Sequence, residues 1–381
     1  TIALVTRANS ATKMRRSLFL AALLVAVLLY SGVEAQSKKY FEKSARRPDA
    51  DFAGPSDPLI LSHYLHDPAT ARKLSEVHGV GSAMSYSGYF TVNATFGSNM
   101  FFWLFPAQNG NPNAPLVMFL QGGPGASSMF GLFREMGPYQ VAPDGKTLVP
   151  NPYTWNKEYS LVFVDNPVGA GWSYTQKVDG FVKNEVDVAR NLYALLEQFF
   201  TVYTDYRSVD FYIAGESYAG HYVPAISHEI YVRNRNNPKV FINMKGISIG
   251  DGSIDPQIQF NHMGELWFRT GLADLKEVKL INQYERRFEE AVRAREFTKA
   301  FHIFDELLNG DFWPYPTLYE NITGLTDYFN FLEPTYAPNP YRTYLNLPST
   351  RASIHVGASA YWDYNATCEF HLIPDWMTSV A

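Results

Sequence analysis

The sequence predicts an α/β protein with a mostly parallel, doubly wound sheet. A strand pair is predicted at residues 86–92 and 100–105, and residues 184–203 place apolar side chains on one face of a helix. Short continuous apolar runs, typical of strands covered on both faces, recur at residues 116–120, 161–164, 211–214 and 246–250. Because these runs alternate with helical segments, right-handed crossovers are expected to join them into one sheet.

Composition and charge indicate a compact globular protein. The chain has 381 residues, of which 46% are hydrophobic and 15% aromatic, and this excludes a disordered class. The net charge is −5, and no run of Lys and Arg of the kind that follows phosphates is present, so no nucleic-acid partner is expected. No Cys and His spacing suits a metal, and no cofactor is implied.

The N-terminus has the pattern of a signal peptide at residues 14–35. Arg15 and Arg16 precede an apolar run at 18–29 that is too short to span a membrane, and a small-residue cleavage site follows. Residues 1–13 precede the first methionine and are interpreted as translated upstream sequence. Residues 36–57 are expected to form a flexible lead-in. The pattern predicts a secreted or endolysosomal protein without a membrane span.

Three N-glycosylation sequons agree with passage through the secretory pathway. They begin at Asn93, Asn321 and Asn365. The single cysteine, Cys368, has no intrachain partner, so it is either buried and inert or available to another chain.

Three segments follow the lead-in. Residues 58–252 contain the first part of an α/β core. In residues 253–345 the strand rhythm is replaced by a charge-rich helical tract at 275–308 and an aromatic, proline-containing stretch. We expect this insertion to form a lid over the carboxyl edge of the sheet. Residues 346–381 return toward the core, and without a further buried-strand run the last strands of the sheet are expected to be missing.

A candidate nucleophile lies between the strand at 211–214 and a helix. Residues 215–220 read Gly-Glu-Ser-Tyr-Ala-Gly, which places Ser217 in a strand–turn–helix context. This is the context of the nucleophile elbow of α/β-hydrolases, where the neighbours two positions from the serine must be small. Taken alone, such a motif is often an ordinary surface turn. The flanking strand and helix favour a catalytic Ser217.

A glycine-rich turn, Gly122-Gly123-Pro124-Gly125, follows the strand at 116–120. It is either a bend without a role or a source of oxyanion donors. Acyl transfer needs two N–H groups that converge on the developing oxyanion. In this architecture one N–H belongs to the residue after the nucleophile, Tyr218, and we assign the other to Gly123.

Four ordered motifs resemble the serine carboxypeptidase family. They are QGGPGASS at 121–128, DNPVGAGWSY at 165–174, GESYAG at 215–220 and GDG at 250–252. The residues in and around the first motif are most similar to those of the vitellogenic-like carboxypeptidase branch. The resemblance covers about residues 58–356 and departs from the family pattern from about Ala358.

The resemblance implies a site for the substrate's C-terminal carboxylate. In the family, the residues matching Glu216 and Glu135 share a proton, and a protonated acid can donate to an anion because two carboxylates in contact cannot both ionise. Gln121 would donate from its amide and Gly122 from its backbone; most of the family has Asn at the position of Gln121. Otherwise, Glu135 would be a solvated carboxylate at a helix end.

The implied activity is removal of C-terminal amino acids from peptides and proteins with a free C-terminus. Ser217 would attack the last peptide bond, and water would hydrolyse the acyl-enzyme. The protonated glutamate pair implies a preference for acidic pH. Transfer of the acyl group to an alcohol would use the same site, but no residue favours it over hydrolysis.

The catalytic base expected after Ser217 is not recognisable. The family's Asp follows a buried strand and its His lies in a glycine-rich loop, and neither motif precedes Ala381. We therefore expect a C-terminally truncated chain that is inactive as given and belongs to an active full-length enzyme. The alternative is a catalytically inactive carboxypeptidase-like binding or storage protein. The histidines after Ser217 are interpreted as packed, solvated or tail residues: His221, His228, His262, His302, His355 and His371.

Overall fold

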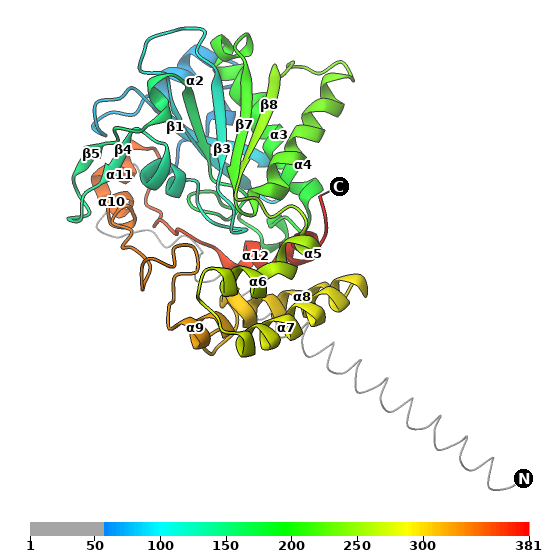
Figure 1. Ribbon diagram of the computed structural model, residues 1–381. Helices are drawn as coiled ribbons and strands as arrows, with labels where there is room; N and C mark the ends of the chain where they lie inside the picture. The colour runs from blue at the N-terminus through cyan, green and yellow to red at the C-terminus, as the bar shows by residue number, and fades with distance from the viewer. Residues whose placement is uncertain (1–56, 381) are drawn as a thin grey trace, which may run out of the picture. The chain divides into compact units, whose positions relative to one another are not determined.

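The computed structural model describes residues 57–380 and contains a six-stranded mixed sheet. The strand order is β1-β2-β6-β3-β7-β8. The antiparallel pairs are β1 with β2 and β2 with β6, whereas β6, β3, β7 and β8 run parallel (Figure 1). The strands are β1 (Tyr86–Asn93), β2 (Ser98–Phe105), β3 (Leu116–Leu120), β6 (Ser160–Val164), β7 (Phe211–Glu216) and β8 (Met244–Gly250). The predicted α/β class with a mostly parallel sheet is confirmed.

Strands β2, β3 and β6 are apolar because the sheet is buried there on both faces. The prediction that 246–250 is also covered on both faces is wrong, since every residue of the edge strand β8 is half-buried or exposed. Successive side chains of a strand point to opposite faces, so each strand supplies two cores. Every residue of β2 is buried. Its side chains divide between the two hydrophobic clusters as Met100, Phe102 and Leu104 on one face and Phe101, Trp103 and Phe105 on the other. This two-sided burial explains why the strands read as continuous rather than alternating apolar runs.

Two long helices cover one face of the sheet: α3 (Glu185–Val202) and α4 (Ala219–Asn234). Helix α3 begins at its N-cap Asn184, whose side chain accepts a hydrogen bond from the Asp187 N–H. Helix α4 begins two residues after Ser217, so the nucleophile lies between β7 and α4. Figure 1 shows both helices along the β7–β8 side of the sheet.

Small elements complete the first part of the chain. They are α2 (Pro68–Leu74), the hairpin β4 (Tyr139–Val141) with β5 (Leu148–Pro150), a π-helical turn (Gly131–Glu135) and short 3₁₀ turns at Leu61–Tyr64, Trp155–Lys157, Val178–Gly180 and Thr204–Arg207. The π-helical turn matters for function because it ends at Glu135.

Residues 253–353 are helical. The elements are α5 (Pro256–Gln259), a 3₁₀ turn (Phe260–His262), α6 (Met263–Arg269), α7 (Leu275–Arg293), α8 (Phe297–Phe304), a π-helical turn (Asp305–Asn309), α9 (Leu318–Thr323), α10 (Tyr341–Asn346) and α11 (Pro348–Ser353). The tract predicted at 275–308 breaks at Arg295, whose φ of +57° ends α7. A lid role for this region stays a prediction.

The last described residues form helix α12 (Ala366–Trp376), which the sequence did not suggest. It runs between the sheet and the helices α6 to α8 (Figure 1), and its Trp376 ring contacts Phe301 and Phe304 of α8. Among residues 57–380 no helix is both long and apolar enough to cross a membrane. The upstream residues 1–13, the signal peptide and nearly all of the lead-in lie outside the described residues.

Candidate functional site

Ser217 occupies a strained turn between β7 and α4. Its φ is +57°, a left-handed conformation that a non-glycine residue adopts only when the surroundings enforce it. The Ser217 N–H donates to the Gly250 carbonyl, 3.1 Å away, and its carbonyl accepts from Ser253 N–H at 3.0 Å. These bonds to the segment after β8 hold the turn in place. The strand–turn–helix position and the strained φ of the half-buried Ser217 are those of a nucleophile elbow.

Small residues are required on both sides of the serine. A Cβ added to Gly215 would lie 2.6 Å from the Cβ of Ala219, and one added to Gly220 would lie 2.5 Å from the Ser253 carbonyl oxygen. Both distances are far below van der Waals contact. Strand β7 and helix α4 therefore approach one another closely only because these positions are small.

The glycine-rich turn after β3 packs directly on this elbow. A Cβ on Gly122 would lie 2.4 Å from the Tyr218 nitrogen and 2.7 Å from the Glu216 carbonyl oxygen. The next residue, Gly123, has a φ of +107° that favours glycine. Since β3 and β7 are neighbours with Leu120 opposite Gly215, the sheet register brings the two turns together. The structure thus places the predicted donors, Gly123 and Tyr218, on adjoining turns beside Ser217.

Glu135 and Glu216 meet although they come from different elements. Glu135 ends the π-helical turn and Glu216 ends β7, and their carboxyl groups share a hydrogen bond. Burial, then the hydrogen bond and the charge of Glu216, raise the pKa of Glu135 to about 9. The interpretation of Glu135 as a solvated helix-end carboxylate does not hold. At neutral pH this pair retains a proton and can donate to an anion.

A third carboxyl group, Asp251, lies near this pair and was missed in the sequence. It follows β8 with a φ of +54°, and burial and the charge of Glu216 raise its pKa. Register places Glu216 opposite Gly250, so the carboxyl ends of β7 and β8 bring the two acids together. The sequence feature that could have identified Asp251 is its position directly after a predicted parallel strand. Ligands bind at the carboxyl edge of such sheets.

Gln121 directly follows β3, and its side chain is buried. Its backbone N–H donates to Ser128 Oγ at 3.1 Å, and its Oε1 has no hydrogen-bond partner among the described residues. A buried amide without a partner for its oxygen is uncommon in folded proteins. The position is consistent with a side chain reserved for a ligand.

Asp165 braces the glycine-rich turn from the next strand, β6. It is fully buried and accepts hydrogen bonds from Ser127 Oγ (2.6 Å), Ser128 N–H (2.9 Å) and Trp172 N–H (2.7 Å). Burial raises the pKa of Asp165 to about 7, against the opposing effect of these hydrogen bonds. Gly171 is required because its Cβ would lie 2.1 Å from Asp165 Oδ2. The motif at 165–174 is therefore a structural support for the site.

Tyr218 is anchored by a buried carboxyl group behind the elbow. Its hydroxyl donates to Glu185 Oε1 at 2.8 Å, and its ring stacks on His221 with centroids 4.8 Å apart. Burial raises the pKa of Glu185 to about 8, and the hydrogen bond from Tyr218 opposes this shift. The Trp376 ring of α12 packs edge-on against Tyr218 at 5.4 Å. The side chain of Tyr218 is thus fixed on several sides.

The buried and half-buried histidines after Ser217 contact groups away from the elbow. His221 Nε2 lies 3.2 Å from the Thr378 carbonyl, and His355 Nδ1 lies 3.0 Å from Ser87 Oγ. The His371 ring contacts Phe181. The exposed histidines lie on the helices or helix ends at His228, His262 and His302. Within residues 57–380, no histidine is hydrogen-bonded to Ser217 Oγ.

One predicted glycosylation site is buried in the fold. Asn365 is 7% exposed, caps α12 and donates from Nδ2 to the Gly169 carbonyl at 2.9 Å. A glycan on this nitrogen would replace that bond, so glycosylation at Asn365 stays a prediction that its burial does not favour. Asn321 is exposed and Asn93 is half-buried, so these two remain predictions. Cys368 is buried and not available to another chain.

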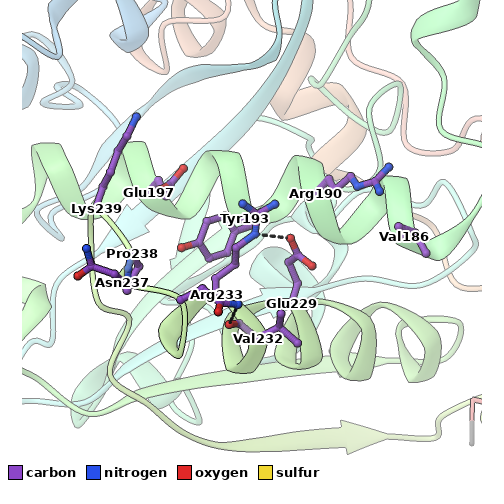
Figure 2. Close-up of a pocket in the computed structure, with 11 residues that line it drawn as sticks. Val186, Arg190, Tyr193, Glu197, Glu229, Val232, Arg233, Asn237, Pro238 and Lys239 are labelled. Atoms are coloured by element: carbon purple, nitrogen blue, oxygen red, sulfur yellow. Dashed lines mark hydrogen bonds and ion pairs between the residues drawn. The ribbon is translucent and has the colours of Figure 1, made fainter.

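A surface groove of about 610 Å³ lies away from this site, between α3 and α4 (Figure 2). Figure 2 shows Arg233 over the Tyr193 ring and in contact with Glu229, at 2.8 Å. None of its lining residues belongs to the turns around Ser217. Its two arginines are thus engaged with neighbouring side chains, since Arg190 also pairs with Asp187.

Comparisons with known proteins agree with the site. The family model for serine carboxypeptidases matches residues 76–379. The chain is 42% identical to the probable serine carboxypeptidase CPVL of Homo sapiens, over 85% of this chain and 68% of that protein. It is 40% identical to the venom serine carboxypeptidase of Apis mellifera, over 85% of this chain and 70% of the other.

Two relatives of lower sequence identity belong to the same group of enzymes by their names. The vitellogenic carboxypeptidase of Aedes aegypti is 35% identical over 84% of this chain and 67% of its own. The crystal structure of a prohormone-processing carboxypeptidase from Saccharomyces cerevisiae shares the fold, with a TM-score of 0.61 and 21% identity over 80% of this chain and 73% of its own. Because the family match runs to residue 379, the expected departure from the pattern at about Ala358 is wrong.

Proposed function

The chain belongs to the serine carboxypeptidase family, and from this premise we propose that Ser217 releases C-terminal amino acids from peptides through an acyl-enzyme. The observation that carries the proposal is the contact between Glu135 and Glu216, directly beside the nucleophile. A retained proton lets this pair donate a hydrogen bond to a substrate carboxylate. Such recognition confines cleavage to the last peptide bond.

The turn after β3 supplies the remaining contacts of the proposal. Gln121 would donate its side-chain amide and Gly122 its backbone N–H to the substrate carboxylate. Gly123 and Tyr218 would donate their N–H groups to the oxyanion that forms when Ser217 Oγ attacks the scissile carbonyl. The packing of Gly122 against the Ser217–Tyr218 peptide supports this division, since it brings the two sets of donors to one place.

Proton transfer needs a base that takes the proton from Ser217 Oγ and returns it to the leaving amine. The family resemblance assigns this role to a His oriented by an Asp, and both stay predictions because residues 57–380 place no histidine at Ser217. Sequencing of the native transcript past the codon for Ala381 tests them. A stop directly after Ala381 would favour the non-catalytic binding or storage protein instead.

We extend the proposal to the secretory pathway. The signal peptide at 14–35 supports a secreted or endolysosomal location. The glutamate pair keeps its proton both at the acidic pH of endolysosomes and at neutral pH, because the pKa of Glu135 is raised to about 9. N-terminal sequencing of the mature protein tests this. A mature chain that begins near Gln36 agrees with the proposal, and one that retains residues 14–35 contradicts it.

The experiment for the activity compares two substrates. The protein purified from its native source is incubated with an N-blocked dipeptide that ends in a free carboxylate and with the same dipeptide as its C-terminal amide. We expect release of the last amino acid from the acid and slow or undetectable cleavage of the amide. Equal rates on both would contradict a role for the glutamate pair in carboxylate recognition.

A further inference from the structure

Three carboxyl groups, two of them buried, meet where the helical region contacts α12. We call Asp305, Asp311 and Glu369 the acidic cluster. Asp305 begins the π-helical turn after α8, Asp311 lies in the loop that follows, and Glu369 lies in the first turn of α12. Asp305 is 1% exposed and Glu369 is 0% exposed, whereas Asp311 is exposed. The cluster therefore joins two parts of the fold through groups that ordinarily carry negative charge.

Asn309 lies at the centre of the acidic cluster. Its Nδ2 donates to Asp311 Oδ2 at 2.9 Å and makes longer contacts of 3.4 Å with Asp305 Oδ1 and Glu369 Oε1. Its Oδ1 accepts from the Tyr328 hydroxyl at 3.2 Å. One amide group has two N–H donors, so it cannot satisfy three carboxylates at full strength.

The cluster also lacks a compensating cation in the part of the chain that the structure describes. Asp305 receives the backbone N–H groups of Asp311 (2.8 Å) and Phe312 (3.1 Å). Glu369 Oε2 is buried and has no hydrogen-bond partner among the described residues, and the Glu369 carboxyl group interacts with that of the exposed Asp311. Two carboxylates in such contact repel unless one of them is protonated.

No neighbouring group relieves this charge. The titratable groups that face the cluster are Tyr328 and Tyr336 from the helical region and Tyr222 from α4, and none of them is a cation. Burial, first among the causes, raises the pKa of Asp311 to about 6 and that of Glu369 well above its ordinary value. The cluster thus holds protons at pH values where solvated carboxyl groups do not.

We propose that Asp311 and Glu369 share a proton, and that this proton fastens the helical region to α12 at acidic pH and releases it at alkaline pH. The consequence reaches the elbow because α12 also contacts the catalytic turns. A Cβ on Gly125 would lie 2.9 Å from the Cys368 Cβ, and the Trp376 ring packs against Tyr218. Loosening of α12 would therefore remove support from the residues beside Ser217.

The direction of the pH effect follows from linkage. A carboxyl group whose pKa is higher in the folded chain than in the unfolded chain makes the folded state bind more protons. Its stabilising effect is complete below the unfolded pKa, near 4, and is lost as pH rises through the folded pKa. For this contact the loss begins at weakly acidic pH, since the pKa of Asp311 is about 6.

The first experiment measures the melting temperature of the full chain from pH 4.5 to pH 8.5. Glu369→Gln places an amide donor against Asp311 at every pH, so it imitates the protonated state. We expect its melting temperature to exceed that of the wild type by a few degrees at pH 8.5 and to match it at pH 4.5. Glu333→Gln is the control, because Glu333 is exposed in the helical region outside the cluster. Parallel curves for Glu369→Gln and wild type would overturn the proposal.

A second variant and a second measurement keep the test informative if Glu369→Gln fails to fold. Asp311→Asn replaces the partner, and hydrogen exchange of the α12 amides reports the contact locally. We expect exchange in the wild type to increase from pH 5 to pH 8 beyond the intrinsic chemical effect, and both variants to abolish this increase. Failure of both variants to fold would overturn the proposal, since it requires that neutral side chains are tolerated. The inference needs no turnover, so its outcome is separate from that of the proposed peptidase activity.

Addition of calcium tests whether the acidic cluster holds a proton or a metal ion. Among residues 57–380 no group of three acids, histidines or cysteines is arranged to hold a metal ion. We therefore expect calcium or EDTA at pH 8 to leave the melting temperature of the wild type unchanged. An increase with calcium that Glu369→Gln abolishes would replace the shared proton with a bound cation.

Discussion

The carboxyl groups of Glu135 and Glu216 are hydrogen-bonded to each other, and Glu216 is the residue immediately before Ser217. The contact depends on the fold, since Glu135 ends a π-helical turn and Glu216 ends a strand. It places a proton that survives at neutral pH beside a nucleophile on a strained turn. In the proposed function, this relationship distinguishes a site for peptide acids from a general hydrolase elbow.

Removal of one glutamate should weaken binding of substrate carboxylates selectively. For Glu135→Ala we expect KM for a peptide acid to rise on the order of 10-fold or more, which corresponds to about 1.4 kcal/mol. KM for a peptide ester or amide should change little, because these substrates lack the carboxylate. Steady-state kinetics with a matched acid and amide measure both. An equal rise for the two substrates would indicate a distorted site instead of a lost carboxylate contact.

The same pair predicts a pH dependence with a defined sign. Because the pKa of Glu135 is raised to about 9, the folded chain holds this proton well above the pH at which a free glutamate loses it. We expect KM for peptide acids to be nearly constant below pH 9 and to rise above it, whereas KM for esters stays flat. A rise centred near pH 4 to 5 would show that the pair ionises like solvated glutamates.

The hydrogen bond between Tyr218 and Glu185 should affect the chemical step. Tyr218→Phe keeps the ring and removes the hydroxyl, so its N–H is held less firmly toward the oxyanion. We expect kcat to fall several-fold with KM nearly unchanged. Glu185→Gln retains an acceptor and should cost less than Glu185→Ala. If Tyr218→Phe and Glu185→Ala act through one bond, the double variant loses no more than the single variants; full additivity would contradict this.

Gly122 should not tolerate a side chain. The Cβ of Gly122→Ala would lie 2.4 Å from the Tyr218 nitrogen, so the two turns must separate. We expect a loss of about 1–3 kcal/mol in the free energy of unfolding together with loss of activity. The control is Gly246→Ala in β8, where the nearest atoms lie at an ordinary 3.4 Å. Denaturant unfolding measures both, and equal stability of the two variants would contradict the close packing.

The sequence predicted the central strands of the sheet well because they are largely buried on both faces. Residues 116–120 coincide with β3, and the predicted strands at 161–164 and 211–214 differ from β6 and β7 only at their ends. Helix α12 was missed because Pro374 and its aromatic, polar composition hide the helical period. The break at Arg295 was missed because neither glycine nor proline marks it.

The site was predictable only in part from residue patterns. Ser217 carries its own local context, whereas the contact between Glu135 and Glu216 requires the positions of β7 and the π-helical turn and came from the family resemblance. Asp251 escaped notice because its proximity to Glu216 follows from the register of β7 and β8. The burial of Asn365 was invisible for the same reason, since a sequon contains no information on packing.

The most direct test of the account is release of the C-terminal amino acid from a peptide acid by the native protein, followed by mass spectrometry, with Ser217→Ala and the C-terminal amide as matched controls. We predict release from the acid, a loss on the order of 10⁴-fold or more for Ser217→Ala, and little reaction with the amide. Release that Ser217→Ala leaves unchanged, or equal cleavage of acid and amide, would contradict a Ser217 carboxypeptidase that recognises the substrate carboxylate through Glu135 and Glu216.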